Sequence, residues 1–120
     1  MSPKTIIHVI QLVGENCITL DDGQKLYNLI YPKISVKDTV ELDFSGVRIF
    51  ASPFMNAAIG QLLKDISADD LNRYLIVDRT KMTPVGLAVL RRVIENAKAY
   101  YSNNEVSQAI DEVLAKETQE

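Results

Sequence analysis

The sequence predicts an α/β domain in which helices pack on a largely parallel sheet of about four strands. Segments rich in β-branched residues alternate along the chain with segments of helical periodicity. Two helical segments open on the same pattern, Ser52-Pro53 and Thr83-Pro84, after a strand-like segment. The first strand-like segment is apolar on both faces, which is typical of a sheet covered by helices.

Composition and charge exclude several classes of function. The 120 residues are 47% hydrophobic and 24% charged, so a single globular domain over 1–120 is expected, with 115–120 as a solvated tail. A net charge of −3 argues against a nucleic-acid binder that works by charge neutralisation. One histidine and one cysteine exclude zinc sites built from such clusters, and no phosphate loop is visible. We expect no metal, no cofactor, no membrane segment and a cytoplasmic setting.

The first strand is expected over residues 5–13, where β-branched residues dominate. Residues 19–31 allow either a hairpin at an Asp-Gly pair or a helix. We favour the helix, because Thr19 followed by Asp22 resembles a capping box. Pro32 is expected to end it.

The second strand is expected over residues 39–44, which alternate between apolar and polar. Residues 53–66 form the clearest helix, with Ser52 as N-cap and Pro53 in the first turn. Its outer side is expected to carry Asn56, Gly60 and Lys64.

The third strand is expected over residues 72–78, followed by a helix over 83–99 that Thr83 caps. The pair Asn103-Asn104 is expected to break the chain. Residues 106–114 then repeat apolar side chains at helical spacing, which predicts a short C-terminal helix.

Polar residues gather where the second strand ends and the next helix begins, at Asp43, Ser45 and Ser52. In open α/β sheets ligands and partners bind at the carboxyl ends of strands, and a helix N-terminus suits an anion. The simpler interpretation is that Ser52 only caps a helix and Asp43 only ends a strand. Thr83 allows the same two interpretations.

Arg79 and Lys81 precede Thr83 and form either a small basic cluster for an acidic partner or an ordinary solvated loop. His8 is interpreted as a structural residue of its strand. A nucleophile–base pair of Cys17 and His8 is conceivable, but no local motif supports it.

The run VELDFSGVRIFASPFMN at residues 40–56 resembles the signature of STAS domains, the domains of anti-sigma-factor antagonists and sulfate transporters. It is more similar still to small bacterial STAS-like proteins, in which a strand of this type leads to a Ser-x-Phe-x-Asn helix start. Residues 72–101 resemble the next strand and helix of that pattern, and residues 106–114 resemble its final helix.

The resemblance implies a regulatory protein-binding module whose partner is a GHKL-type, histidine-kinase-like ATPase or another signalling protein. In anti-sigma-factor antagonists, that kinase phosphorylates the second serine of an Asp-Ser-Ser-Gly loop. Here Ser52 matches the first serine, and the phosphoacceptor position falls on Pro53, which has no hydroxyl. Ala51 and Phe54 stand at the aspartate and glycine. The phosphorylation cycle of those relatives is therefore not expected at this position.

The expected function is thus partner binding without catalysis. The residues expected to contact a partner or an anion are Asp43, Ser45, Ser52, Asn56, Gly60, Lys64 and Thr83. A small-ligand sensor that holds a nucleotide or anion at the Ser52 and Thr83 helix starts stays open, as does a self-associating structural subunit. An enzyme is the least supported alternative, because motifs for a base and a nucleophile are missing.

Overall fold

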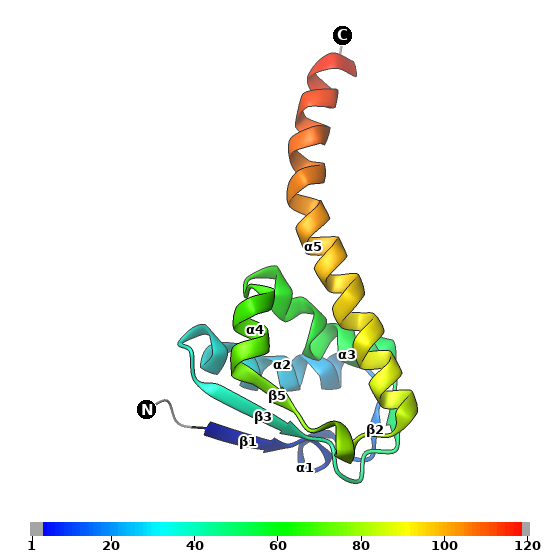
Figure 1. Ribbon diagram of the computed structural model, residues 1–120. Coiled ribbons are helices and arrows are strands. Elements are labelled where there is room, and N and C mark those ends of the chain that lie inside the picture. The colour runs from blue at the N-terminus through cyan, green and yellow to red at the C-terminus, as the bar shows by residue number, and fades with distance from the viewer. Residues whose placement is uncertain (1–3, 119–120) are drawn as a thin grey trace.

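The computed structural model describes the backbone of residues 4–118 and the side chains of residues 4–101 (Figure 1). The strands are β1 (Lys4–His8), β2 (Asn16–Cys17), β3 (Thr39–Asp43), β4 (Ile49–Phe50) and β5 (Leu75–Val77). The α-helices are α1 (Val9–Val13), α2 (Leu20–Ser35), α3 (Ser52–Ala58), α4 (Ala68–Tyr74) and α5 (Pro84–Thr118), and the 3-10 helices are η1 (Gly60–Lys64) and η2 (Arg79–Lys81). The predicted α/β class is confirmed.

The strands form two parallel ladders rather than one sheet of about four strands. β1, β3 and β5 make a three-stranded sheet with β3 in the centre, and β2 pairs with β4 separately. All of these pairings are parallel, and the expected strands 39–44 and 72–78 are represented by β3 and β5, which pair with each other. The split follows from the turn after β3, where the Val47 N–H donates to the Phe44 carbonyl and redirects the chain toward β2.

Helices α2, α3 and α4 lie on the same side of the three-stranded sheet (Figure 1). Val40 and Leu42 of β3 point to that side and are fully buried. Their apolar register partners, Ile7 on β1 and Leu75 and Val77 on β5, are partly buried against the same core. Alternate residues of each strand therefore point to the opposite side. Only one face of the sheet therefore contributes to the core.

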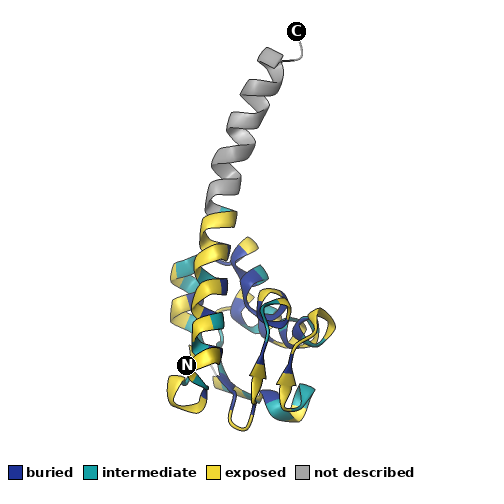
Figure 2. Cartoon of the chain, turned by 90° about the vertical axis from the view of Figure 1, so that its right-hand side faces the viewer, coloured by how far each residue is buried: buried dark blue, intermediate teal, exposed yellow. Residues whose placement is uncertain are grey.

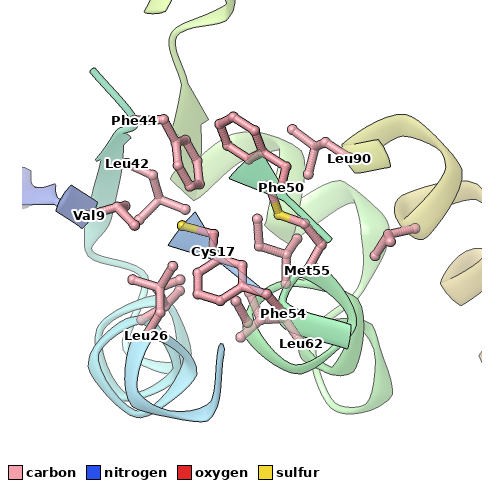
Figure 3. Packing of buried hydrophobic residues seen from close by; sticks show 14 of the residues in the cluster. Val9, Cys17, Leu26, Leu42, Phe44, Phe50, Phe54, Met55, Leu62 and Leu90 are labelled. Carbon is pink, nitrogen blue, oxygen red and sulfur yellow. The ribbon is translucent and has the colours of Figure 1, made fainter. Parts of the chain in front are cut away.

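The core lies between β3, α2 and α3 (Figure 3). Cys17, Leu26, Phe44 and Phe54 are fully buried there. The rings of Phe44 and Phe50 meet edge to face with centroids 5.5 Å apart, so the two ladders share this core.

Glycines allow two close helix contacts. A Cβ on Gly23 would collide with the Phe54 carbonyl oxygen, so α2 crosses α3 almost in backbone contact. A Cβ on Gly86 would stand 2.6 Å from Cδ2 of Phe50, so the start of α5 lies on that ring. Neither position has room for a side chain.

The expected strand 5–13 is wrong beyond His8, because residues 9–13 form helix α1. β3 ends at Asp43, the register partner of His8, so the residues after His8 have no strand to pair with. The chain turns instead, the Gly14 N–H donates to the Ile10 carbonyl at 2.9 Å, and Val9 becomes fully buried. Burial thus overrides the strand propensity of β-branched residues.

Residues 20–35 form helix α2, so the helix favoured over a hairpin for this segment is confirmed. Thr19 caps it by accepting a hydrogen bond from the Asp22 N–H at 3.1 Å. The expectation that Pro32 ends it is wrong, because the helix continues to Ser35. Pro32 costs one helical hydrogen bond on the exposed side of the helix. Burial of Ile34, which is 2% exposed, holds the last turn in place.

The helix expected over 53–66 is divided into α3 and η1. The break lies at Ile59, whose φ of −122° and ψ of −46° are not helical. Residues 72–74, expected as strand, belong to α4, and β5 begins only at Leu75. Strand pairing between β3 and β5 covers Leu75–Val77 alone, which fixes this boundary.

The last helix also departs from expectation, since α5 is continuous from Pro84 to Thr118 and is not broken at Asn103-Asn104. Asparagine disfavours a helix far less than proline does. Residues 115–118, expected in a solvated tail, are helical, whereas 119–120 lie outside the described residues. The side chains of 106–114 also lie outside the described residues, so the predicted apolar row stays a prediction. None of the described helices is long and apolar enough to cross a membrane.

Candidate functional site

Three titratable side chains stand at the carboxyl ends of the three parallel strands. His8 is the last residue of β1 and pairs in register with Asp43, the last residue of β3. Asp78 directly follows β5, one position beyond the paired residues Leu42 and Val77. Because side chains alternate along strands, all three stand on the face that carries no helix.

Asp43 is the centre of this row. Its Oδ1 accepts a hydrogen bond from the Ser45 N–H at 2.8 Å, and its Oδ2 lies 3.3 Å from Lys81 Nζ and 3.4 Å from His8 Nδ1. Asp43 is also a buried charged residue, only 8% exposed. One carboxylate therefore holds together β1, the turn after β3 and η2.

These contacts keep Asp43 ionised. Hydrogen bonds from Ser45, followed by that from Lys81, lower the pKa of Asp43 to about 2, against the opposing effect of burial. A carboxyl group with such a pKa does not donate a proton near neutral pH. Within the described residues, no three His, Cys, Asp or Glu side chains come together as a metal site. The arrangement is that of an electrostatic clamp.

Asp78 and Lys81 owe their positions to η2. Asp78 Oδ1 accepts hydrogen bonds from the Thr80 N–H at 2.9 Å and the Thr80 hydroxyl at 2.6 Å, which lower the pKa of Asp78. This turn carries Lys81 back toward the sheet, where its ammonium meets Asp43. Of the two basic residues that precede Thr83, Arg79 and Lys81, Lys81 is therefore paired with a carboxylate of the same chain.

The face beyond this row carries no helix. Exposed positions alternate with partly buried ones along β1 and β5, and partly buried positions alternate with buried ones along β3 as far as Leu42. Figure 2 shows the buried residues gathered in the interior between helices and strands. Ile6, Glu41 and Ile76 stand side by side across the three strands. The two isoleucines are 49% and 38% exposed, and Lys4 Nζ lies 2.9 Å from Glu41 Oε1. We call the residues Lys4, Ile6, His8, Glu41, Asp43, Ile76 and Asp78 the open face.

Ser52 does not cap helix α3 as expected. The N-cap is Ala51, whose backbone is extended, and no side chain accepts a hydrogen bond there. Ser52 is itself the first helical residue and is partly buried, and Pro53 after it is exposed. The chain enters the helix one residue early because the Ala51 N–H is held by the Cys17 carbonyl at 2.8 Å.

The outer row expected on this helix is also incomplete. Asn56 and Lys64 are exposed, but Gly60 is buried. A Cβ on Gly60 would stand 3.2 Å from Cγ1 of Val93, so α5 lies over this position. Gly60 therefore contributes to helix packing and not to a surface.

Thr83 caps α5 as predicted, because its hydroxyl accepts a hydrogen bond from the Gly86 N–H at 3.0 Å. The structure brings Asp43 and Ser45 together, as expected. Asn56 lies on α3 and Lys64 on η1, and both of these helices meet α5. Neither residue belongs to the open face.

The sequence of residues 22–81, half of the 120-residue chain, matches the family described as STAS-like domain of unknown function (DUF4325). The chain belongs to this family of STAS-like domains. A comparison with curated proteins and with solved structures gives no match.

The STAS-like region defined by this match contains β3, β5 and η2, and with them Asp43, Asp78 and Lys81. β1 precedes it, so His8 comes from outside the matched residues. Pro53, which the resemblance aligns with the phosphoacceptor of anti-sigma-factor antagonists, also lies within the matched residues.

Cys17 takes no part in the site of the STAS-like domain. It is fully buried in the core on the helix-covered side of the sheet (Figure 3), and burial raises the pKa of its thiol to about 12. The side chain of His8 is 51% exposed on the opposite face. The conceivable Cys17–His8 pair is therefore absent.

Sequence reasoning missed His8 and Asp78 as members of the site. A signal was present, because each β-branched strand segment ends on a titratable residue, in TIIH, VELD and LIVD. This signal becomes informative only when the strand ends and the register between strands are known. The expected strand 5–13 instead placed His8 in the middle of a strand.

Proposed function

We propose that this STAS-like domain is a regulatory module that binds another protein through the open face and catalyses no reaction. The proposal includes a cytoplasmic setting and a signalling protein as the partner. The partner class that the resemblance implies, a GHKL-type ATPase, stays a prediction.

The open face is the observation that supports this proposal. Purely parallel sheets occur almost only with both faces covered, because their strands are apolar on both sides. Here helices cover one face, and Ile6 and Ile76 are half-exposed on the other. A partner that covers this face would complete the usual two-sided arrangement.

The chemistry of the site argues for binding rather than turnover. Asp43, the most buried ionisable side chain of the row, is held by Ser45 and Lys81 and keeps its charge. A group in that state is a fixed anion and a poor acid. At the phosphoacceptor position, Pro53 offers no hydroxyl for a phosphoryl group.

Photocrosslinking in the native cells tests the proposal. A photoreactive amino acid is placed at Ile76 on the open face, at Ile49 beside the Ser52 junction, or at Val36 at the end of α2; all three residues are exposed. We expect one protein to be crosslinked from position 76 and not from position 36. Crosslinking from position 49 alone would move the binding surface to the junction, and equal crosslinking from all three would contradict a defined surface.

The small-ligand and self-association alternatives are checked on the purified chain. A nucleotide or anion at 100 times its dissociation constant raises the free energy of unfolding by about 2.7 kcal/mol, which a thermal-shift screen detects. Light scattering after size exclusion measures self-association. A strong thermal shift would favour the sensor, and a stable oligomer would favour the structural subunit.

A further inference from the structure

We infer that the partner presents an amphipathic helix whose contact stripe is apolar around one central lysine or arginine. This inference rests on the proposed function and names the chemistry of the partner for the same open face. It comes from the row Ile6, Glu41 and Ile76, which are register partners across β1, β3 and β5.

The row places one carboxylate between two apolar side chains. Neighbouring strands lie about 4.8 Å apart, so the two isoleucines stand about 10 Å from each other with Glu41 midway. Ile6 is 49% and Ile76 38% exposed, and the Glu41 side chain keeps 17% of its surface exposed. A docked helix would bury both isoleucines and meet the carboxylate in the middle.

Covering the row takes Glu41 out of water, so its charge must stay paired. Lys4 is its present partner, at 2.9 Å, but the Lys4 side chain is 49% exposed on the edge strand. Exposed ion pairs contribute little, so a cation from the partner can replace Lys4 at small cost while Lys4 returns to water. The second carboxylate of β3, Asp43, is bound by Ser45 and Lys81 and is not free to exchange.

A helix supplies this combination with a simple pattern. Residues three and four positions away surround a given residue on the helix surface. A lysine or arginine with apolar residues at those positions brings a cation to Glu41 and apolar contacts to Ile6 and Ile76. The aliphatic part of the basic side chain also packs on apolar surface. A glutamate in the central position would instead face Glu41 with the same charge.

Two synthetic helical peptides test this inference on the full chain. Each has about 18 residues, enough for a stable helix, and leucines around one central residue. The peptides differ only in that residue, lysine or glutamate, and carry a fluorescent label for anisotropy titration. We expect the lysine peptide to bind at least tenfold more tightly, and Glu41→Lys to reverse the preference.

Two further variants separate the row from general electrostatic attraction. Glu95→Lys makes the same charge change at an exposed position of α5, and we expect it to leave the preference as in the wild type. Glu41→Gln should abolish the preference for the lysine peptide without reversing it. This variant replaces Glu41→Lys in the test if circular dichroism shows that Glu41→Lys is unfolded. An unchanged preference in Glu41→Gln, an equal effect of Glu95→Lys, or no binding of either peptide would overturn the inference.

The two proposals fail in different ways. A protein crosslinked from position 76 together with peptides that show no charge preference would leave docking on the open face intact and refute the basic helix. Absence of any crosslink at position 76 would refute the docking surface itself.

Discussion

Lys81 Nζ lies 3.3 Å from Asp43 Oδ2, and this contact ties the segment before α5 to the end of the central strand. The two residues are 38 positions apart in the sequence. Asp43 thereby joins the sheet to the element that leads into the longest helix. The stability of this clamp can be measured directly.

Acid should weaken the protein through Asp43. Its pKa in the folded chain is about 2, below the ordinary 3.8, so its stabilising effect is fully present above about pH 4 and lost as the pH falls through 2. We expect Asp43→Asn to lower the free energy of unfolding by about 1–2 kcal/mol at pH 7, and the gap to the wild type to shrink toward pH 2. Denaturant melts across this range measure it. Asp65→Asn, at an exposed carboxylate, is the control, and a similar gap for both variants would contradict the clamp.

Capping threonines should matter more than Ser52. Thr19 and Thr83 accept backbone hydrogen bonds at the starts of α2 and α5, whereas Ser52 caps nothing. Replacing either threonine with alanine should cost about 1 kcal/mol, and Ser52→Ala should change the free energy of unfolding by less than about 0.5 kcal/mol. Urea melts of the three variants make the comparison. A Ser52→Ala cost equal to that of Thr83→Ala would restore Ser52 as a cap.

Adding a methyl group at Gly23 and at Gly60 should destabilise the protein to different degrees. At Gly23 a Cβ meets the backbone of Phe54, which cannot move without shifting α3, whereas at Gly60 it meets a Val93 methyl at 3.2 Å. We expect Gly23→Ala to destabilise by about 1–3 kcal/mol or more and Gly60→Ala by clearly less. Thermal melts rank them. The reverse order would mean that the α2–α3 crossing is looser than described.

Cys17 should be inert in the native protein. Burial raises the pKa of its thiol to about 12, so almost no thiolate exists at pH 8. A thiol reagent such as Ellman's reagent should therefore react only after denaturation. Rapid reaction of the folded chain would show that the core around Cys17 opens.

Phosphorylation of Ser52 should not switch this domain. Ser52 is partly buried in the first turn of α3, next to Pro53, which the resemblance aligns with the phosphoacceptor of anti-sigma-factor antagonists. Intact-mass analysis of protein from its native cells should show no substantial species heavier by one phosphoryl group at Ser52. Such a species, together with loss of regulated partner release in Ser52→Ala, would refute this.

Local patterns predicted much of the secondary structure. Alternation marked 39–44 as a strand, and the Thr19 and Thr83 caps marked the starts of α2 and α5, because a cap depends on residues only three positions away. The family was also evident from the run 40–56, which lies within the matched residues 22–81. Asp43 and Ser45 were both expected at the end of the strand 39–44, because they are only two positions apart in the sequence.

Tertiary contacts decided the rest. Residues 9–13 have the β-branched composition of a strand, yet they are helical because the sheet offers them no partner after His8. Pro32 lies inside a helix because burial of Ile34 outweighs one lost hydrogen bond. Local helix propensity amounts to less than about 1 kcal/mol for an ordinary residue and about 3 kcal/mol for proline. Burial of apolar side chains contributes about 1.5–3 kcal/mol each, and their sum decides these boundaries.

The sequence by itself determined that a strand lies within residues 39–44 and that α2 and α5 begin after Thr19 and Thr83. Only the tertiary structure aligned His8, Asp43 and Asp78 in one row and left Ile6, Glu41 and Ile76 uncovered. Register depends on how strands far apart in sequence pair, and a shift of one residue would turn each of these side chains to the other face. The open face is therefore a product of strand pairing, which no local pattern encodes.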